Sequence, residues 1–306
     1  MEMEGFKGHL EVDKKGNEIL NEEHITTEEF ERQFSEEQLV EIDGYDPIPY
    51  TTITPENPTS ENWVVYVGGF SQGKETYLDE IKSLVHSGRK VLFTNPTKGI
   101  DGENDSQLKI PDTIQNKSRA LDEVLKAAGA ESVDFVAHSQ GAAVVTTYAA
   151  QHPDTTNKMV LECPAGLMEG IDTRLSIMAR FIDDKVSAVL TDTKNILGKS
   201  GLRGGRSFSG NLIKDVKYRW EEEVPGVAEV DIAPLLKTIK ERDYGTEVIL
   251  LNANEDKAFS PERIEETLGD NPLEEYIDRW AMYERKKASH SAPIVERPGL
   301  LRQILE

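Results

Sequence analysis

The stretch that decides the fold is Val133-Asp-Phe-Val-Ala-His-Ser139-Gln-Gly141-Ala-Ala-Val-Val-Thr-Thr-Tyr148. An apolar run of strand length leads into Ser139, and a segment with helical spacing of apolar residues follows it. A serine on a sharp strand-to-helix turn would present its hydroxyl above a sheet. Such a turn needs tiny residues two positions before and two after the serine, and Ala137 and Gly141 meet that need. Ala137 departs from the more familiar glycine, which the steric argument tolerates.

Strand-like and helix-like segments alternate on both sides of this stretch. The expected strands are Gln38–Ile42, Tyr50–Ile53, Trp63–Val67, Lys90–Thr94, Val133–Ala137, Lys158–Glu162, Glu247–Asn252 and the end of Leu273–Lys286. The expected core helices are Glu28–Phe34, Thr76–Val85, Asp112 to Gly129, Gln140–Ala150 and short helices opened by Pro261 and Pro298. Asp112 with Gln115 predicts a variant of the capping box, and Gly129 predicts the end of that helix. The alternation predicts an α/β fold with a doubly wound, mostly parallel sheet.

The alternation stops after Glu162 and returns at Glu247. Apolar residues recur there at helical spacing, in the sets Leu167–Ile182, Val186–Leu197, Leu212–Trp220 and a helix started by Asp231 that carries Leu235, Leu236 and Ile239. We therefore expect an inserted α-helical cap over residues 166–242. The core would consist of residues 46–165 and 243–306, after an acidic N-terminal extension over residues 1–45 whose first 35 residues we expect to be solvated or loosely attached.

Composition places the chain in a broad class. The 306 residues carry a net charge of −21, which opposes binding to nucleic acid or to an anionic membrane. The single Cys163 rules out an intramolecular disulfide and fits a reducing compartment, and we expect it to pack in the core. Because Met1–Gly5 lacks the features of a signal peptide and no run approaches membrane-spanning length, the sequence predicts a cytoplasmic protein.

The charge is unevenly distributed along the chain. Residues 1–45 hold 14 acidic and 4 basic side chains, whereas Thr193–Arg219 holds seven basic side chains and one acidic one. Such a basic stretch is most often a solvated loop. Two hypotheses are that its Gly198–Arg219 part attracts an anionic group of a substrate or the acidic N-terminal extension. Unchanged kcat/KM for anionic and neutral esters in an Arg203→Ala/Arg206→Ala variant would contradict the first.

A serine hydroxyl is a poor nucleophile at neutral pH, so it needs a base and an acid that orients the base. The six histidines are His9, His24, His86, His138, His152 and His290. The first two lie in the acidic extension, and positions 86 and 152 suit helix-terminal or exposed roles. Strand geometry turns the His138 side chain away from that of Ser139. By elimination His290, between the last expected strand and the terminal helix, is the candidate base.

The orienting acid should follow a strand of the sheet. Asp256 lies in the turn between an expected strand and the next helix, and Glu255 and Glu162 are alternatives. Acyl transfer also needs donors for the developing oxyanion. The backbone amide of Gln140 is one candidate, and a second is expected from the Gly68-Gly69-Phe70 loop, where glycine allows close approach of the backbone.

Four pieces of the chain, in this order, resemble the α/β-hydrolase superfamily. They are Val67–Phe70, Ala137–Gly141, Leu251–Asp256 and Ala288–His290, and the resemblance extends over roughly Trp63 to Glu306, with a helical cap inserted after Glu162. Gly68 stands where many members have histidine, and Ala253 stands where many have glycine. Neither departure removes a reacting group.

The resemblance implies a set of roles. Ser139 would be the nucleophile, His290 the base and Asp256 the orienting acid, with an oxyanion hole from the amides of Phe70 and Gln140. The implied reaction is hydrolysis of a carboxylic ester through an acyl-enzyme, with no cofactor and no metal.

We expect a small-molecule ester as substrate. Gly69 and Met168 are candidate substrate-binding residues, although the apolar cap residues around position 168 are also expected to pack the cap against the core. A thioesterase, peptidase or carbon–carbon bond hydrolase would use the same three residues. From another class, a non-catalytic ligand-binding protein on this fold is the alternative.

Overall fold

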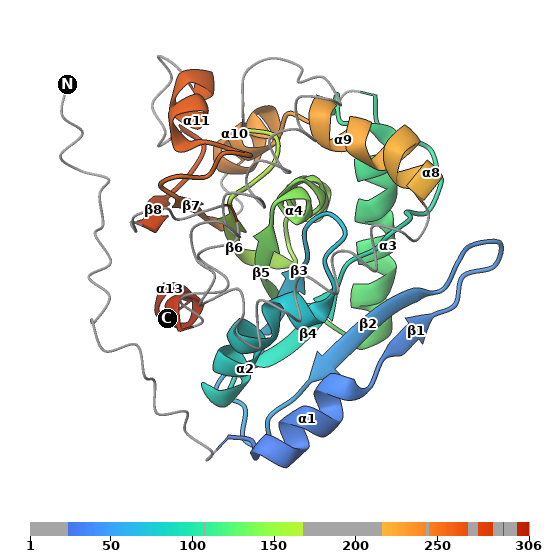
Figure 1. Cartoon of the computed structure of the whole chain (residues 1–306), viewed down its shortest axis with the longest axis vertical. Coiled ribbons are helices and arrows are strands. Elements are labelled where there is room, and N and C mark those ends of the chain that lie inside the picture. Colours follow the sequence, from blue (N-terminus) through green and yellow to red (C-terminus); the bar gives the residue numbers. More distant parts are fainter. Residues whose placement is uncertain are drawn as a thin grey trace.

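A mostly parallel sheet organises the described part of the chain, with strand order β1-β2-β4-β3-β5-β6-β7-β8 (Figure 1). The computed structural model describes residues 24–106, 108–167, 216–242, 245–268, 275–283, 290 and 299–305. The strands are β1 (Gln38–Val40), β2 (Ile48–Ile53), β3 (Trp63–Val67), β4 (Lys90–Thr94), β5 (Val133–His138), β6 (Thr156–Glu162), β7 (Glu247–Ala253) and β8 (Arg279–Tyr283). The pairs from β4 to β8 are parallel, while β2 is antiparallel to both β1 and β4.

Helices cover both faces of this sheet (Figure 1). One face packs against α1 (Thr27–Ser35), α2 (Leu78–His86) and α13 (Leu300–Leu305), and the other against α3 (Asp112–Ala128), α4 (Gln140–Gln151) and α10 (Ala233–Glu241). Successive strand side chains point to opposite faces of the sheet. On β3, Val64 and Tyr66 therefore belong to the apolar cluster with α1, α2 and α13, while Val65 and Val67 belong to the cluster with α3, α4 and α10. The predicted doubly wound α/β fold is confirmed.

The start of α3 differs from the sequence prediction. Its N-cap position is Pro111, with no side-chain capping hydrogen bond. Gln115 instead donates its side-chain amide to the backbone oxygen of Ile110 at 2.9 Å. The predicted capping box is therefore wrong, because the Gln115 side chain supports the preceding loop. The predicted end is confirmed, since Gly129 adopts a left-handed conformation with φ of 66°.

The segment before β1 belongs to the packed molecule. Phe30 of α1 is 1% exposed and Ile25 is equally buried, both in the apolar cluster of α2 and α13. The side chain of Thr26 caps α1 by accepting from the Glu29 amide at 3.2 Å. The expectation of a loosely attached segment is wrong for residues 24–35, since a short amphipathic helix with one large apolar residue suffices for docking.

Helices also make up the described end of the expected cap, residues 216–242. They are α8 (Val216–Tyr218), the π-helical segment η2 (Arg219–Glu223), α9 (Val224–Glu229) and α10. In α10 the apolar residues Leu235, Leu236 and Ile239 are buried as predicted. Trp220, expected on an apolar helix face, is 43% exposed. The other expected cap helices lie within residues 168–215, outside the described residues.

The described ranges contain helices of different lengths and polarity. None of them is long and apolar enough to cross a bilayer.

Candidate active site

Ser139 occupies the sharp turn between β5 and α4. Its φ of 55° and ψ of −119° are strained for a residue with a side chain. Its amide donates to the backbone oxygen of Glu162 at 2.9 Å, and its own carbonyl accepts from the amides of Ala142 and Ala165, both at 3.1 Å. These three bonds hold the turn. Among the described residues, the buried Ser139 hydroxyl has no hydrogen-bond partner.

Close packing of α4 on β3 explains the glycine two residues after Ser139. A Cβ atom at Gly141 would lie 2.4 Å from the backbone oxygen of Val67 and 2.8 Å from that of Gly68. Both contacts are with backbone, which cannot give way cheaply. Ala137 is fully buried opposite Val67 in the β3–β5 pairing. Glycine is thus required at position 141 because the start of α4 packs against the end of β3 there.

Asp256 and His290 are brought together by the fold. The Asp256 carboxylate lies just after β7, and its Oδ1 accepts hydrogen bonds from the amides of Ala258 and Phe259 at 2.8 and 3.0 Å. Its Oδ2 lies 2.8 Å from Nδ1 of His290, and both side chains are buried. The Phe259 ring packs at 5.3 Å from the His290 ring. One carboxylate oxygen is therefore fixed by the backbone, and the other is directed at the imidazole.

The two alternative acids are placed differently. Glu255 is exposed. Glu162 is fully buried, and its carboxyl lies 2.6 Å from the hydroxyl of Tyr66, which is also 2.5 Å from the carboxyl of Glu80. Burial raises the pKa of Glu162 to about 7 and that of Glu80 well above its usual range. Because Tyr66 has a single hydroxyl proton, these two short contacts require that one carboxyl be protonated.

The other described histidines have structural contacts. Nδ1 of His24 lies 2.9 Å from the backbone oxygen of Asn57. The buried His86 ring lies 6.1 Å from the Phe30 ring, and the His152 ring stacks on Tyr148 at 4.4 Å. His9 lies outside the described residues.

His138 is a neighbour of the site that the sequence did not reveal. Its ring packs 4.7 Å from that of His290, and its Nε2 lies 3.3 Å from the His290 backbone oxygen. Its Nδ1 lies 2.9 Å from the side-chain oxygen of Gln72 and 3.1 Å from the Tyr77 hydroxyl. The residue before the serine thus supports the ring and backbone of His290. The only signal in the sequence was its position next to Ser139.

The Gly68–Gln72 loop is held against the serine turn. The amide of Gly69 donates to the Tyr77 hydroxyl at 2.7 Å, and the Asn95 side-chain amide donates to the carbonyls of Gly69 and Gln72 at 2.8 and 2.7 Å. A Cβ atom at Gly69 would lie 3.0 Å from Cβ of Ser139. Glycine is needed there because the loop approaches the serine so closely.

A possible ligand set for a metal overlaps the same site. Among the described residues, Cys163, Asp256 and His290 offer ligand atoms that lie within 4.8 Å of one another. Burial, followed by the negative charge of Asp256, raises the pKa of the Cys163 thiol well above its usual range, so the thiol is neutral. Since Asp256 and His290 are already directed at each other, this set is better suited to proton transfer than to holding a cation.

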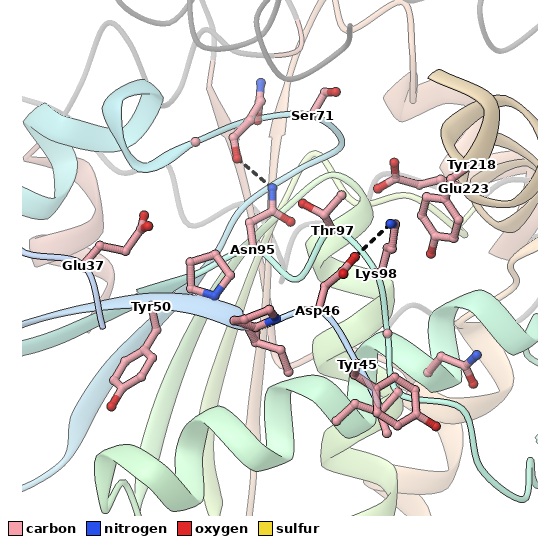
Figure 2. A pocket seen from close by; sticks show the side chains of 18 of the residues that line it. Glu37, Tyr45, Asp46, Tyr50, Ser71, Asn95, Thr97, Lys98, Tyr218 and Glu223 are labelled. Carbon is pink, nitrogen blue, oxygen red and sulfur yellow. Dashed lines mark hydrogen bonds and ion pairs between the residues drawn. The ribbon is translucent and has the colours of Figure 1, made fainter. Parts of the chain in front are cut away.

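A cavity of about 780 Å³ adjoins the loop after β3 (Figure 2). Ser71 and Gln72 form part of its wall, next to Phe70. Tyr218 and Glu223 contribute from the other side, and the Lys98–Asp46 ion pair of 2.8 Å lies between. The cavity therefore lies beside the candidate site, with a lining of hydroxyl, amide, aromatic and paired charged groups.

Comparison with known proteins places this arrangement in a family. The model of the alpha/beta hydrolase fold matches residues 111–266, which include the serine turn and Asp256. The chain belongs to the α/β hydrolase fold family. Met168, a candidate substrate contact on sequence grounds, lies outside the described residues of this hydrolase-fold chain.

Individual relatives of this α/β hydrolase fold chain have low sequence identity to it. Monoacylglycerol lipase abhd6-B of Xenopus laevis is 30% identical over 119 residues, covering 38% of this chain and about a third (34%) of that protein. A serine hydrolase of Cycloclasticus zankles is similar in structure, with a TM-score of 0.61 and 16% identity, covering 88% of this chain and 97% of the other. An esterase of Exiguobacterium antarcticum has a TM-score of 0.61, 14% identity and the same coverage, 88% and 97%.

Proposed function

We propose that the protein is a serine hydrolase that cleaves a carboxylic ester. The observation that carries the proposal is the buried hydrogen bond of 2.8 Å between Asp256 and His290, residues 34 positions apart. The His290 ring packs 4.7 Å from that of His138, the residue before the strained Ser139. The names of the relatives support the same class: a monoacylglycerol lipase, a serine hydrolase and an esterase.

In the proposed reaction, Asp256 holds the proton of His290 on Nδ1, so that Nε2 is the basic nitrogen. His290 takes the hydroxyl proton of Ser139 as the oxygen attacks the ester carbonyl. The amides of Phe70 and Gln140 stabilise the resulting oxyanion. His290 then gives the proton to the departing alcohol, leaving an acyl group on Ser139. Water, activated by the same base, releases the acid and restores the serine.

A fluorophosphonate probe tests this proposal directly. The folded protein should be labelled at Ser139, and a Ser139→Ala variant should not be labelled. Ser118→Ala is the matched control, because Ser118 is also buried, and within the described residues its hydroxyl likewise has no hydrogen-bond partner. Absence of labelling on folded wild-type protein would overturn the assignment to the serine hydrolases and favour a ligand-binding protein.

We further propose that the cavity beside Phe70 holds the part of the substrate remote from the scissile bond. A panel of nitrophenyl esters of increasing acyl length, with a thioester of matched acyl group, would define the preferred leaving group and chain. Filling the cavity by Thr97→Trp should raise KM several-fold with little change in kcat, since Thr97 lines the cavity and Ser139 does not. An unchanged KM for every ester would contradict this placement.

A further inference from the structure

Three buried charged side chains join the η2 segment to the core. Glu223, the last residue of η2, forms ion pairs with Lys117 of α3 and, at 2.6 Å, with Arg219 at the start of η2. The relative exposures of the Lys117, Arg219 and Glu223 side chains are 1%, 6% and 2%. One carboxylate thus binds two cations from different elements, and we call these three residues the ionic clamp.

Each cation of the ionic clamp also contacts a residue proposed to form the oxyanion hole. The ammonium of Lys117 donates to the side-chain oxygen of Gln140 at 2.9 Å. The guanidinium carbon of Arg219 lies 5.5 Å from the centre of the Phe70 ring, within the range of a cation–π interaction. The two residues belong to separate parts of the chain, the loop after β3 and the start of α4. The ionic clamp is therefore a physical link between them.

The contact with Lys117 also orients the Gln140 carboxamide. An ammonium group can only donate, so the side-chain oxygen of Gln140 must face it. The amide nitrogen then points elsewhere, and it has no partner among the described residues although the side chain is 1% exposed. Leaving a buried donor unsatisfied costs about 1–3 kcal/mol. Such a donor suits a site where an acceptor on a substrate arrives.

Stability alone is a poor explanation for the ionic clamp. Desolvation of buried ions costs several kcal/mol each, and a buried ion pair is often no more stabilising than apolar residues of similar volume. Burial lowers the pKa of Lys117, while the charge of Glu223 opposes that shift. The three side chains have a formal sum of one positive charge, next to residues whose amides would meet a developing negative charge.

We propose that Lys117, Glu223 and Arg219 are positioning residues that set the geometry of the oxyanion hole. The inference rests on the proposed function. Through Gln140 and Phe70, the ionic clamp fixes the two backbone amides relative to each other, so that η2 contributes to catalysis without touching the substrate's reacting atoms. Changes in the ionic clamp should then affect the transition state more than the bound substrate.

The test uses the full chain with Lys117→Met and Arg219→Met, which remove the contacts with Gln140 and Phe70 respectively. The matched control is Arg89→Met, which breaks the mostly buried Arg89–Asp134 ion pair at the opposite end of β5. The readouts are the rate of fluorophosphonate labelling, kcat and KM for a nitrophenyl ester, and unfolding in denaturant.

Both ionic-clamp variants should lower kcat and the labelling rate at least about tenfold, since loss of one oxyanion donor lowers kcat by about 10²–10³. KM should be nearly unchanged in Lys117→Met, whereas Arg219 lines the cavity, so the KM of Arg219→Met also reports on substrate binding there. The control should lose stability and keep its kcat. If Arg219→Met does not fold, Arg219→Lys keeps the charge but loses the planar group over Phe70, and a fall in kcat is expected there too.

Two results would be distinguishable. Folded variants that keep wild-type kcat and labelling rate would overturn the role of the ionic clamp and leave the hydrolase assignment standing. Wild-type protein that neither reacts with the probe nor hydrolyses any ester would overturn the hydrolase assignment and this inference with it.

Discussion

At the scale of single residues, Asp256 is the proposed acid. Asp256 uses one carboxylate oxygen for two backbone amides and the other for His290. Asp256→Asn should therefore keep the fold and reduce kcat by about 10³–10⁴-fold, because the amide no longer fixes the required imidazole tautomer. The rate of ester hydrolysis at pH 7 measures this fall in kcat, and Glu255→Gln, at an exposed residue, is the control. Full activity in Asp256→Asn would move the acid to Glu162 or Glu255.

Glu162 should instead be visible in the pH dependence of stability. Its pKa is raised to about 7 in the folded protein by burial, so the folded state holds its proton more tightly than the unfolded state. The contribution of Glu162 to stability is fully present below about pH 4.5 and is lost as the pH rises towards 7. Glu162→Gln removes this loss.

Denaturant unfolding of both proteins at pH 5 and pH 8 measures the effect. The fall in unfolding free energy between the two pH values should be smaller in Glu162→Gln, by roughly 1–3 kcal/mol. An identical fall in both proteins would show that Glu162 is ionised in the folded state throughout this range.

At the scale of elements, the approach of α4 to β3 is fixed by Gly141. Gly141→Ala would drive a Cβ atom into the backbone oxygens of Val67 and Gly68, so we expect a loss of about 1–3 kcal/mol in unfolding free energy and slower fluorophosphonate labelling. Gly129→Ala is the control. Alanine would be strained by about 1 kcal/mol in the left-handed conformation at this position, yet its Cβ atom would meet nothing within 4 Å. Labelling should be unchanged in that control. Equal labelling rates in the two variants would show that the close packing at Gly141 does not affect the reactivity of Ser139.

The elements also show where sequence patterns are reliable. The strands around Trp63–Val67 and Glu247–Ala253 were predictable to within a residue, because a buried parallel strand is an unbroken apolar run. The start of α3 was not, because Gln115 had a competing partner in the loop before it. Lys117 lies on the buried side of α3 with Ile114 and Leu121, a spacing that could have indicated a buried charge.

At the scale of the whole molecule, the N-terminal segment contributes to the same core as the C-terminal helix. Phe30 of α1 is 1% exposed in the cluster that contains Leu301 and Ile304 of α13. Phe30→Ala should reduce the unfolding free energy by about 3–5 kcal/mol, measured by denaturant titration. Leu39→Ala, at a side chain 52% exposed, should change it by less than about 0.5 kcal/mol. A small effect of Phe30→Ala would restore the view of a loosely attached extension.

The sequence by itself determined the layered sheet and the serine turn. Both depend on periodicity and on residue size over a few neighbouring positions, as in Ala137–Gly141. Only the tertiary structure decided which acid meets His290, that Glu162 pairs with Tyr66, and that Glu223 reaches Lys117. These contacts join residues 34, 96 and 106 positions apart. The reason is physical: a local pattern states which side chains are buried, whereas the partner of a buried charge depends on how the elements cross.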